Sequence, residues 1–244
     1  MADWSGCRTK VKKETHQFDF CVVGGGMAGL IAAVSAARHG TKVALVQDRP
    51  VLGGNASSEV RMHIVGANGT GSFDRGQDLE TEAREGGIVE EVRLENCVRN
   101  PQRSASVFDL ILYDKCRSES NLTLLLNTTV TSVQKQGQRI EFAVAERQST
   151  EDQFCIRAAV FVDCTGDGRL GAEAGAAFTE GRESRAESGE TLARDAGDGN
   201  RLGSTILLQA RKHQRPMPFT APGWARRFSK HDLRLRLYAT PGEE

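Results

Sequence analysis

The stretch that decides the fold is FDFCVVGGGMAGLIAAVSAARHG, which runs from Phe18 to Gly40. Its apolar residues 18–23 predict a short buried strand, and the alanine-rich residues 27–39 predict a helix that Gly40 ends in a left-handed conformation. A second apolar stretch, KVALVQ over residues 42–47, predicts the next strand. Strand, glycine turn, helix and strand in about 30 residues form a βαβ unit with parallel strands and a right-handed crossover.

Three glycines occupy the turn of this unit with the spacing G-x-G-x-x-G, at Gly24, Gly26 and Gly29. In a dinucleotide-binding turn the first glycine permits the tight bend, the second leaves the backbone open to a pyrophosphate, and the third lets the helix pack closely against the sheet. The helix then directs its unpaired N–H groups and the positive end of its dipole at the phosphates. Glycine triplets also occur in simple turns, but the strand–turn–helix context favours nucleotide binding.

The same motif predicts an acidic side chain on the ribose about 20 residues further on, at the end of the second strand. Gln47 and Asp48 follow Gly29 by 18 and 19 residues, so a glutamine stands where such folds often carry a glutamate. Gln47 can hydrogen-bond a ribose hydroxyl, or Asp48 can supply the carboxylate. An exposed acid at the end of a strand is an equally good interpretation of Asp48.

Beyond residue 76, periodicity and turn residues predict two helices followed by antiparallel strands. In order, we expect a helix over residues 79–100 interrupted near Gly86 and Gly87, a helix over 104–120 with Ser104 or Ser106 as N-cap, a strand over 122–127, a hairpin that turns at Gln136 and Gly137, a strand pair over 154–168, an exposed loop over 180–200, and a strand over 202–210.

Composition excludes several classes of partner. Lys plus Arg and Asp plus Glu each number 32, so no net field attracts nucleic acid or an anionic membrane. No apolar stretch is long enough to span a bilayer, and residues 1–17 lack the apolar segment of a secretory signal. We therefore predict a disordered leader over residues 1–17 and a cytoplasmic chain. The six cysteines form no C-x-x-C pair, and no spacing of potential ligands predicts a metal site.

The residues that carry a family resemblance lie in three segments: the G-G-G-x-A-G turn, RPVLGG over residues 49–54, and VFVDCTGDG over 160–168. Together they resemble the N-terminal part of FAD-dependent oxidoreductases of the glutathione-reductase-like superfamily, and most of all the bacterial FAD dependent oxidoreductase family. The resemblance covers approximately residues 18–233. It implies an α/β, Rossmann-like FAD/NAD(P)-binding fold, a parallel sheet flanked by helices, with an antiparallel β-meander inserted over residues 130–156.

The resemblance also implies a division of the chain and a cofactor. We expect an FAD-binding domain over residues 18–178 and a loop-rich, partial substrate or cap region over 179–244. Enzymes of the family continue well beyond 244 residues, so we expect a fragment, a truncated product or a shortened member. The residues expected to hold FAD are Gly24, Gly25, Gly26, Met27, Ala28 and Gly29, then Gln47, Asp48, Arg49, Gly53, Gly54, Asn55 and Ser57, then Val130, Cys164, Thr165, Gly166 and Asp167.

Within that set, Gly53 and Gly54 offer a second backbone approach to the pyrophosphate, and Asn55 and Ser57 offer hydrogen bonds to phosphate, ribityl chain or flavin ring. Val130 lies where the family contacts the adenine with backbone groups, although a plain position in the strand core explains it equally well.

Arg61 and His63 are the candidate catalytic residues, because they follow the pyrophosphate segment and can stabilise an anionic flavin or transfer a proton. An ion pair for Arg61 and a hydrogen-bonded loop position for His63 are the alternatives. The predicted function is electron or hydride transfer between a small-molecule substrate and bound FAD. A non-catalytic nucleotide-binding module or inactive remnant, and an NAD(P)-only dehydrogenase, are the alternatives.

Overall fold

The computed structural model describes residues 11–64, 86–202, 213–229, 231 and 232. The chain divides into two compact units, Met1–Leu202 and Gly203–Glu244. The predicted helical residues 79–85 and most of the predicted strand 202–210 lie outside the described residues. The limits of the FAD-binding domain, at residues 18 and 178, remain a prediction.

The first unit holds every named helix and strand of the described residues. The strands are β1 (Lys13–Val23), β2 (Val43–Val46), β3 (Leu122–Leu125), β4 (Thr128–Gln136), β5 (Arg139–Arg147) and β6 (Gln153–Asp163). The helices are α1 (Met27–Arg38), a 3₁₀ turn η1 (Gly54–Ala56), α2 (Ile88–Arg99), α3 (Ala105–Arg117), α4 (Arg169–Glu173) and α5 (Arg185–Ser188).

The strands form one six-stranded mixed sheet in the order β3-β2-β1-β6-β5-β4. Strands β3, β2, β1 and β6 are parallel neighbours, whereas β6, β5 and β4 are antiparallel. This confirms the predicted α/β fold, with a parallel sheet and an antiparallel meander. It also confirms the predicted hairpin turn, since β4 ends at Gln136 and Gly137 follows with a positive φ of 61°.

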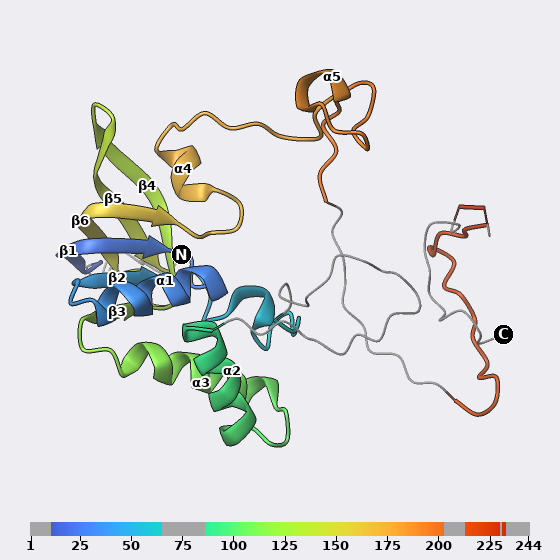
Figure 1. The fold of residues 1–244 in the computed structure, drawn as a ribbon, viewed down its shortest axis with the longest axis horizontal. Coiled ribbons are helices and arrows are strands. Elements are labelled where there is room, and N and C mark those ends of the chain that lie inside the picture. Colours follow the sequence, from blue (N-terminus) through green and yellow to red (C-terminus); the bar gives the residue numbers. More distant parts are fainter. Residues whose placement is uncertain (1–10, 65–85, 203–212, 230, 233–244) are drawn as a thin grey trace, which may run out of the picture. The chain divides into compact units, whose positions relative to one another are not determined.

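Two apolar layers cover opposite faces of the parallel strands, because successive side chains of a strand point to opposite sides. On one face, the small residues of α1 pack on β1 and β2 together with α2 and α3, as Figure 1 shows. On the other face, Cys21 and Val23 pack with β4, β5 and Leu170 of α4. All four residues of β2 are buried, as expected for a parallel strand covered on both faces.

The extent of strand β1 corrects the prediction that residues 1–17 form a disordered leader. It begins at Lys13, so residues 13–17 belong to the sheet, where they pair with Gln153–Arg157 of β6. The polar residues of this segment gave no apolar pattern in the sequence, because their strand conformation depends on hydrogen bonds to β6 and little on burial.

Three other elements differ from their predicted limits. Residues 153–163 form the single strand β6, and not a strand pair, because the whole segment pairs with β1 without a turn. Helix α2 begins at Ile88, after Gly87 with its positive φ of 79°. Helix α3 ends at Arg117, before the predicted limit of residue 120. Its N-cap is Ser104, one of the two predicted caps, whose side chain accepts a hydrogen bond from the N–H of Val107 at 3.5 Å.

The predicted exposed loop over residues 180–200 is exposed but contains the short helix α5. Ser184 and Glu187 form a capping box at its start, and Arg182 pairs with Asp198 across the loop. In the second unit, the described residues form turns, bends and segments without regular secondary structure, with the side chains of Phe219 and Trp224 exposed.

Candidate functional site

A pocket of about 900 Å³ lies at the carboxyl ends of β1, β2 and β6. Ligands of open α/β sheets bind at such strand ends, where neighbouring strands connect in opposite directions. The pocket is lined by Val23, Gly24, Gly26, Met27, Ala28, Val46, Gln47, Asp48, Arg49, Gly53, Gly54, Asn55, Ala56, Glu59, Val60, Met62, His63, Ile64, Thr128, Thr129, Val130, Cys164, Thr165, Gly166, Asp167 and Arg169.

The first glycine turn has two positions where the protein itself excludes a side chain. Gly24 has φ +102°, and a Cβ there would lie 2.2 Å from the carbonyl oxygen of Cys164. A Cβ on Gly29 would lie 1.9 Å from the carbonyl oxygen of Gly24. These contacts account for the tight turn and for the close packing of α1 on the sheet.

Gly26 is different, because a side chain at this position would clash with no atom of the protein. A Cβ on Gly26 would meet only the Cα of Gly54, at 4.0 Å. Gly26 is the N-cap of α1, has no side-chain cap, and is followed by no acidic residue in the first turn. The first-turn N–H groups of α1 can therefore donate hydrogen bonds to an anion in the pocket.

The second glycine segment lies against the first. Gly53 donates its N–H to the carbonyl of Gly25 at 2.8 Å, and Gly53 pairs with Gly26 in a parallel bridge. Both Gly53 and Gly54 have positive φ, at 104° and 56°. A Cβ on Gly54 would come within 3.1 Å of the Cα of Gly26, so two bare backbone segments meet beside the pocket.

The residues after β2 have different environments. Gln47 is buried and hydrogen-bonds the backbone of Gly25 and Val51, whereas Asp48 is exposed. Arg49 makes two hydrogen bonds of 2.9 Å to the carboxylate of Glu59, which also lines the pocket. The hydrogen bond to Glu59 raises the pKa of Arg49 above its ordinary value.

The turn after β6 is organised by Asp163, which the sequence analysis did not select. Its carboxylate accepts hydrogen bonds from the N–H of Thr165 at 3.0 Å, the hydroxyl of Thr165 at 2.7 Å and the N–H of Gly171 at 2.8 Å. Partial burial opposes the charge, but these hydrogen bonds outweigh it and lower the pKa of Asp163. Asp163 therefore holds Thr165, Gly166 and Asp167 at the pocket.

The first residues of β4 close another side of the pocket. Val130 lines it and is also buried in the core, so the two interpretations of Val130 are compatible. Thr128 and Thr129 line the pocket as well, and the sequence analysis missed both. Nothing in the sequence pattern singled them out as ligand contacts, since threonine is an ordinary residue at the start of a strand.

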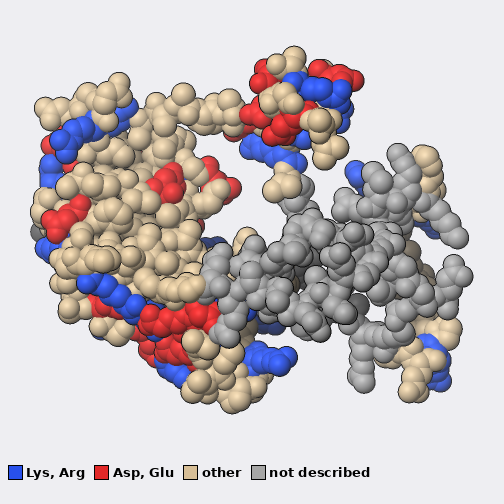
Figure 2. All heavy atoms as spheres, in the orientation of Figure 1, with Lys and Arg blue, Asp and Glu red and all other residues tan. Residues whose placement is uncertain are grey.

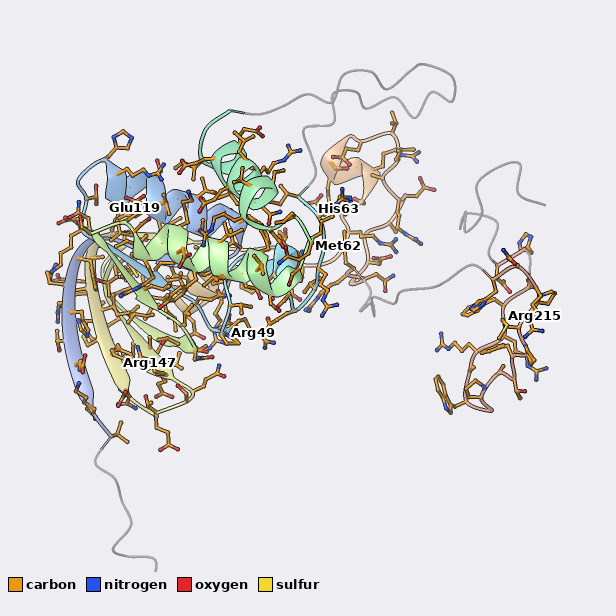
Figure 3. All side chains as sticks on the ribbon, turned by 90° about the horizontal axis from the view of Figure 1, so that it is seen from below. Arg49, Met62, His63, Glu119, Arg147 and Arg215 are labelled. Carbon is orange, nitrogen blue, oxygen red and sulfur yellow. The ribbon has the colours of Figure 1, made fainter. Side chains whose placement is uncertain are left out.

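The two candidate catalytic residues have separate positions. His63 lines the pocket with Met62, and Figure 3 shows the two next to each other on the segment that follows η1. Arg61 is not among the lining residues. It has a positive φ of 63°, and its Nε donates to the carbonyl of Ser58 at 3.1 Å.

Three residues of the predicted cofactor set lie beneath the pocket wall. Gly25 and Gly29 support the first turn, and the buried Ser57 accepts hydrogen bonds from the backbone of Glu59 and Arg61. The other 15 members of the set line the pocket, and their contact with FAD remains a prediction.

Among the described residues, no three Cys, His, Asp or Glu side chains are placed to hold a metal ion. No helix in that part of the chain has the length and apolar character of a membrane-spanning segment.

The parallel sheet, the open backbone at Gly26 and Gly54, and the uncapped start of α1 define a dinucleotide-binding protein. The sequence profile of the family described as FAD dependent oxidoreductase matches residues 19–243. This chain belongs to the FAD-dependent oxidoreductase family, and its cofactor is FAD. The pocket fits that group, because a pyrophosphate needs the close backbone approach that the bare glycines permit.

Two curated proteins are similar to part of the chain. The soluble pyridine nucleotide transhydrogenases of Chromohalobacter salexigens and Marinobacter nauticus are 48% and 43% identical to it over 42 residues. The matched stretch makes up 17% of this chain and 9% of each transhydrogenase.

Solved structures are similar at lower identity. One is a geranylgeranyl bacteriochlorophyll reductase-like protein from Thermoplasma acidophilum, at 16% identity over 69% of this chain and 45% of that chain, with a TM-score of 0.45. Another is the myxobacterial chondrochloren halogenase CndH, a variant of FAD-dependent halogenases, at 17% identity over 70% of this chain and 41% of that chain, with a TM-score of 0.44. The matched region is less than half of either structure.

Proposed function

We propose that this chain forms the FAD-binding part of an oxidoreductase that passes electrons or hydride between a small organic substrate and bound flavin. One observation carries the proposal: two bare glycine segments, at Gly26 and Gly54, face each other at the start of α1 beside a pocket of about 900 Å³. Side chains at either position would occupy the space that a pyrophosphate needs.

In this proposal, different segments of the pocket contact different parts of the cofactor. The N–H groups of the first turn of α1 bind the pyrophosphate, and their dipole favours its charge. The residues after β2 and at the start of β4 hold the adenosine half. Asn55, His63 and the turn after β6 are left for the flavin half. The flavin supplies the redox chemistry when bound, while the chain binds it, orients it and sets the charge around it.

His63 is the described pocket residue best suited to transfer a proton at the substrate, because an imidazole exchanges protons near neutral pH. Arg61 is the weaker candidate of the two, since its guanidinium is hydrogen-bonded to the backbone of its own turn.

Membership of the family favours an oxidoreductase over a non-catalytic nucleotide-binding module, and favours FAD over a nicotinamide as the resident cofactor. The substrate is proposed only as a small organic molecule that donates or accepts electrons at the flavin.

The visible spectrum of the purified chain tests the proposal. We expect flavin absorption bands and release of one FAD per chain after denaturation. Anaerobic addition of candidate electron donors should then bleach the bound flavin. A colourless chain that FAD cannot reconstitute would contradict FAD binding, and bound flavin that no class of donor bleaches would contradict the oxidoreductase activity.

A further inference from the structure

Arg61 has a backbone conformation that residues with side chains rarely adopt. Its φ is 63°, in the left-handed region that favours glycine. The carbonyl of Ser57 accepts the N–H of Val60 at 3.3 Å and the N–H of Arg61 at 2.8 Å, so the chain makes a single turn before Arg61. A left-handed residue directly after such a turn ends it and redirects the chain.

The change of direction at Arg61 brings the following residues back to the segment that precedes the turn. The N–H of Met62 donates to the carbonyl of Asn55 at 2.8 Å. Within residues 59–64, Arg61 alone does not line the pocket, whereas Met62 and His63 line it directly after the change of direction. Any other conformation at Arg61 would lead the chain elsewhere and break the hydrogen bond of Met62.

The side chain of Arg61 stabilises the turn from outside the pocket. Its Nε donates to the carbonyl of Ser58 at 3.1 Å. The N–H of Ser58 donates to the carboxylate of Asp109 in α3 at 2.9 Å. Both backbone groups of Ser58 are therefore satisfied, and the turn is attached to α3.

The position of the guanidinium argues against a direct role for Arg61 at the cofactor. A group that transfers a proton or stabilises a charge must come within hydrogen-bond reach of the reacting atoms. Arg61 is exposed and outside the pocket lining, and among the described residues the arginines that line the pocket are Arg49 and Arg169. What Arg61 contributes to the pocket is the course of its backbone.

Resting on the proposed function, we propose that Arg61 is a positioning residue whose left-handed backbone directs Met62 and His63 into the pocket, beside the bound cofactor. Its guanidinium stabilises the turn and takes no part in the chemistry. His63 therefore lies beside the cofactor only while residue 61 keeps the left-handed conformation.

Modification of histidines by diethyl pyrocarbonate, measured by mass spectrometry on the full chain, tests this proposal. In the wild type, the exposed His63 should react readily when FAD is absent. With FAD at about 100 times its Kd, about 1% of the chains are unoccupied, so the reaction at His63 should slow by about tenfold or more. His39, exposed at the end of α1, should react at one rate with and without FAD.

Three variants separate the backbone of residue 61 from its side chain. Arg61→Gly and Arg61→Asn lack the guanidinium but adopt the left-handed conformation readily, so both should keep the protection of His63 by FAD. Arg61→Val carries a β-branched side chain that opposes this conformation, so it should lose the protection even when saturated with FAD. The amide of Met62 should exchange with solvent faster in Arg61→Val, while the amides of β1 keep their protection, which distinguishes a local change from a general loss of stability.

The results separate this proposal from the proposed function. If Arg61→Gly or Arg61→Asn loses the protection of His63, the guanidinium itself is needed and the assignment of Arg61 is overturned, although cofactor binding stands. Arg61→Val that keeps the protection of both His63 and the Met62 amide overturns the assignment too. So does a wild-type chain that binds FAD and leaves His63 unprotected. A wild-type chain that binds no FAD overturns the proposed function and this assignment together.

Discussion

The three glycines of the first turn have different surroundings, as the motif predicts. Gly24 and Gly29 are required by the protein, since a Cβ at either position would overlap backbone atoms. The protein itself does not require a glycine at Gly26, since its φ of −63° and its surroundings would accept an alanine. Substitution at Gly26 therefore separates cofactor binding from folding.

We predict that Gly26→Ala folds normally and loses FAD. The free energy of unfolding without cofactor should stay within about 0.5 kcal/mol of the wild type. The affinity for FAD should fall by about tenfold or more, because the methyl group occupies the space of the pyrophosphate. Urea denaturation and fluorescence titration with FAD measure the two effects.

Gly29→Ala is the control, and it should destabilise the chain by several kcal/mol, because its Cβ would lie 1.9 Å from the carbonyl of Gly24. Full affinity for FAD in Gly26→Ala would contradict the placement of the pyrophosphate.

We predict that His63→Asn slows flavin reduction without weakening FAD binding. With a donor that bleaches the wild-type flavin, the rate should fall by about 100-fold or more, the usual contribution of a general acid or base. Stopped-flow absorbance measures the rate of flavin reduction in the variant and in the wild type. His39→Asn, at an exposed position after α1, is the control. An unchanged rate in His63→Asn would remove His63 from the mechanism.

At the scale of elements, helices α1, α2 and α3 are joined by ion pairs around Glu91. Arg38 donates two hydrogen bonds to its carboxylate, at 2.7 and 2.9 Å, and Lys115 donates a third at 2.7 Å. Arg38 also binds Glu119 after α3. Figure 2 shows acidic and basic side chains next to one another over this side of the first unit.

The position of Glu91 makes the helix layer sensitive to acid. The hydrogen bonds from Arg38 and then Lys115 lower the pKa of Glu91 to about 2. Because the folded pKa lies below the ordinary value, the stabilisation is present at neutral pH and is lost as the pH falls from about 5 towards 2.

We predict that Glu91→Gln lowers the free energy of unfolding at pH 7 by about 0.5–1 kcal/mol, the range for partly exposed ion pairs. The difference from the wild type should shrink at pH 3, where Glu91 begins to lose its charge. Urea denaturation at both values measures it. Glu141→Gln, which breaks a single exposed pair with Arg157, is the matched control and should have a smaller effect. An equal loss at both pH values would contradict an electrostatic origin.

At the scale of the molecule, the pocket is built from segments that are far apart in the chain. Gly24, Gly53, Val130 and Cys164 come from four different turns and strands, and the parallel sheet brings them to one edge. A ligand that contacts all four segments binds only the folded chain, so its binding free energy adds to the stability of the whole first unit.

We predict that FAD, and not NAD, raises the melting temperature of the chain freed of cofactor. At a concentration 100 times its Kd, FAD should add about 2.7 kcal/mol, which corresponds to a shift of about 5–10 °C in a chain of this size. Scanning calorimetry with each nucleotide measures the shift. A larger shift with NAD would contradict FAD as the resident cofactor.

Much of this arrangement was predictable because it depends on local rules. The βαβ unit, the hairpin at Gly137 and the grouping of the glycine segments follow from hydrophobic period, turn chemistry and the spacing of glycines, each of which acts over a few residues. The predictions that needed correction, the leader over residues 13–17 and the strand pair at β6, both concern pairing with a distant strand.

By itself, the sequence determined the class of fold, the glycine turn before α1 and most of the residues that line the pocket, because glycines with this spacing between a strand and a helix are typical of a dinucleotide-binding fold. Only the tertiary structure decided that Gln47 faces the backbone while Asp48 faces the pocket, that Asp163 holds the turn after β6, and that Arg61 turns back on its own loop. The physical reason is that a polar side chain bonds whichever partner the folded backbone places nearest to it. For Gln47 that partner, Gly25, is distant in the chain, whereas Asp163 and Arg61 bond neighbours whose positions depend on the exact course of their own turns.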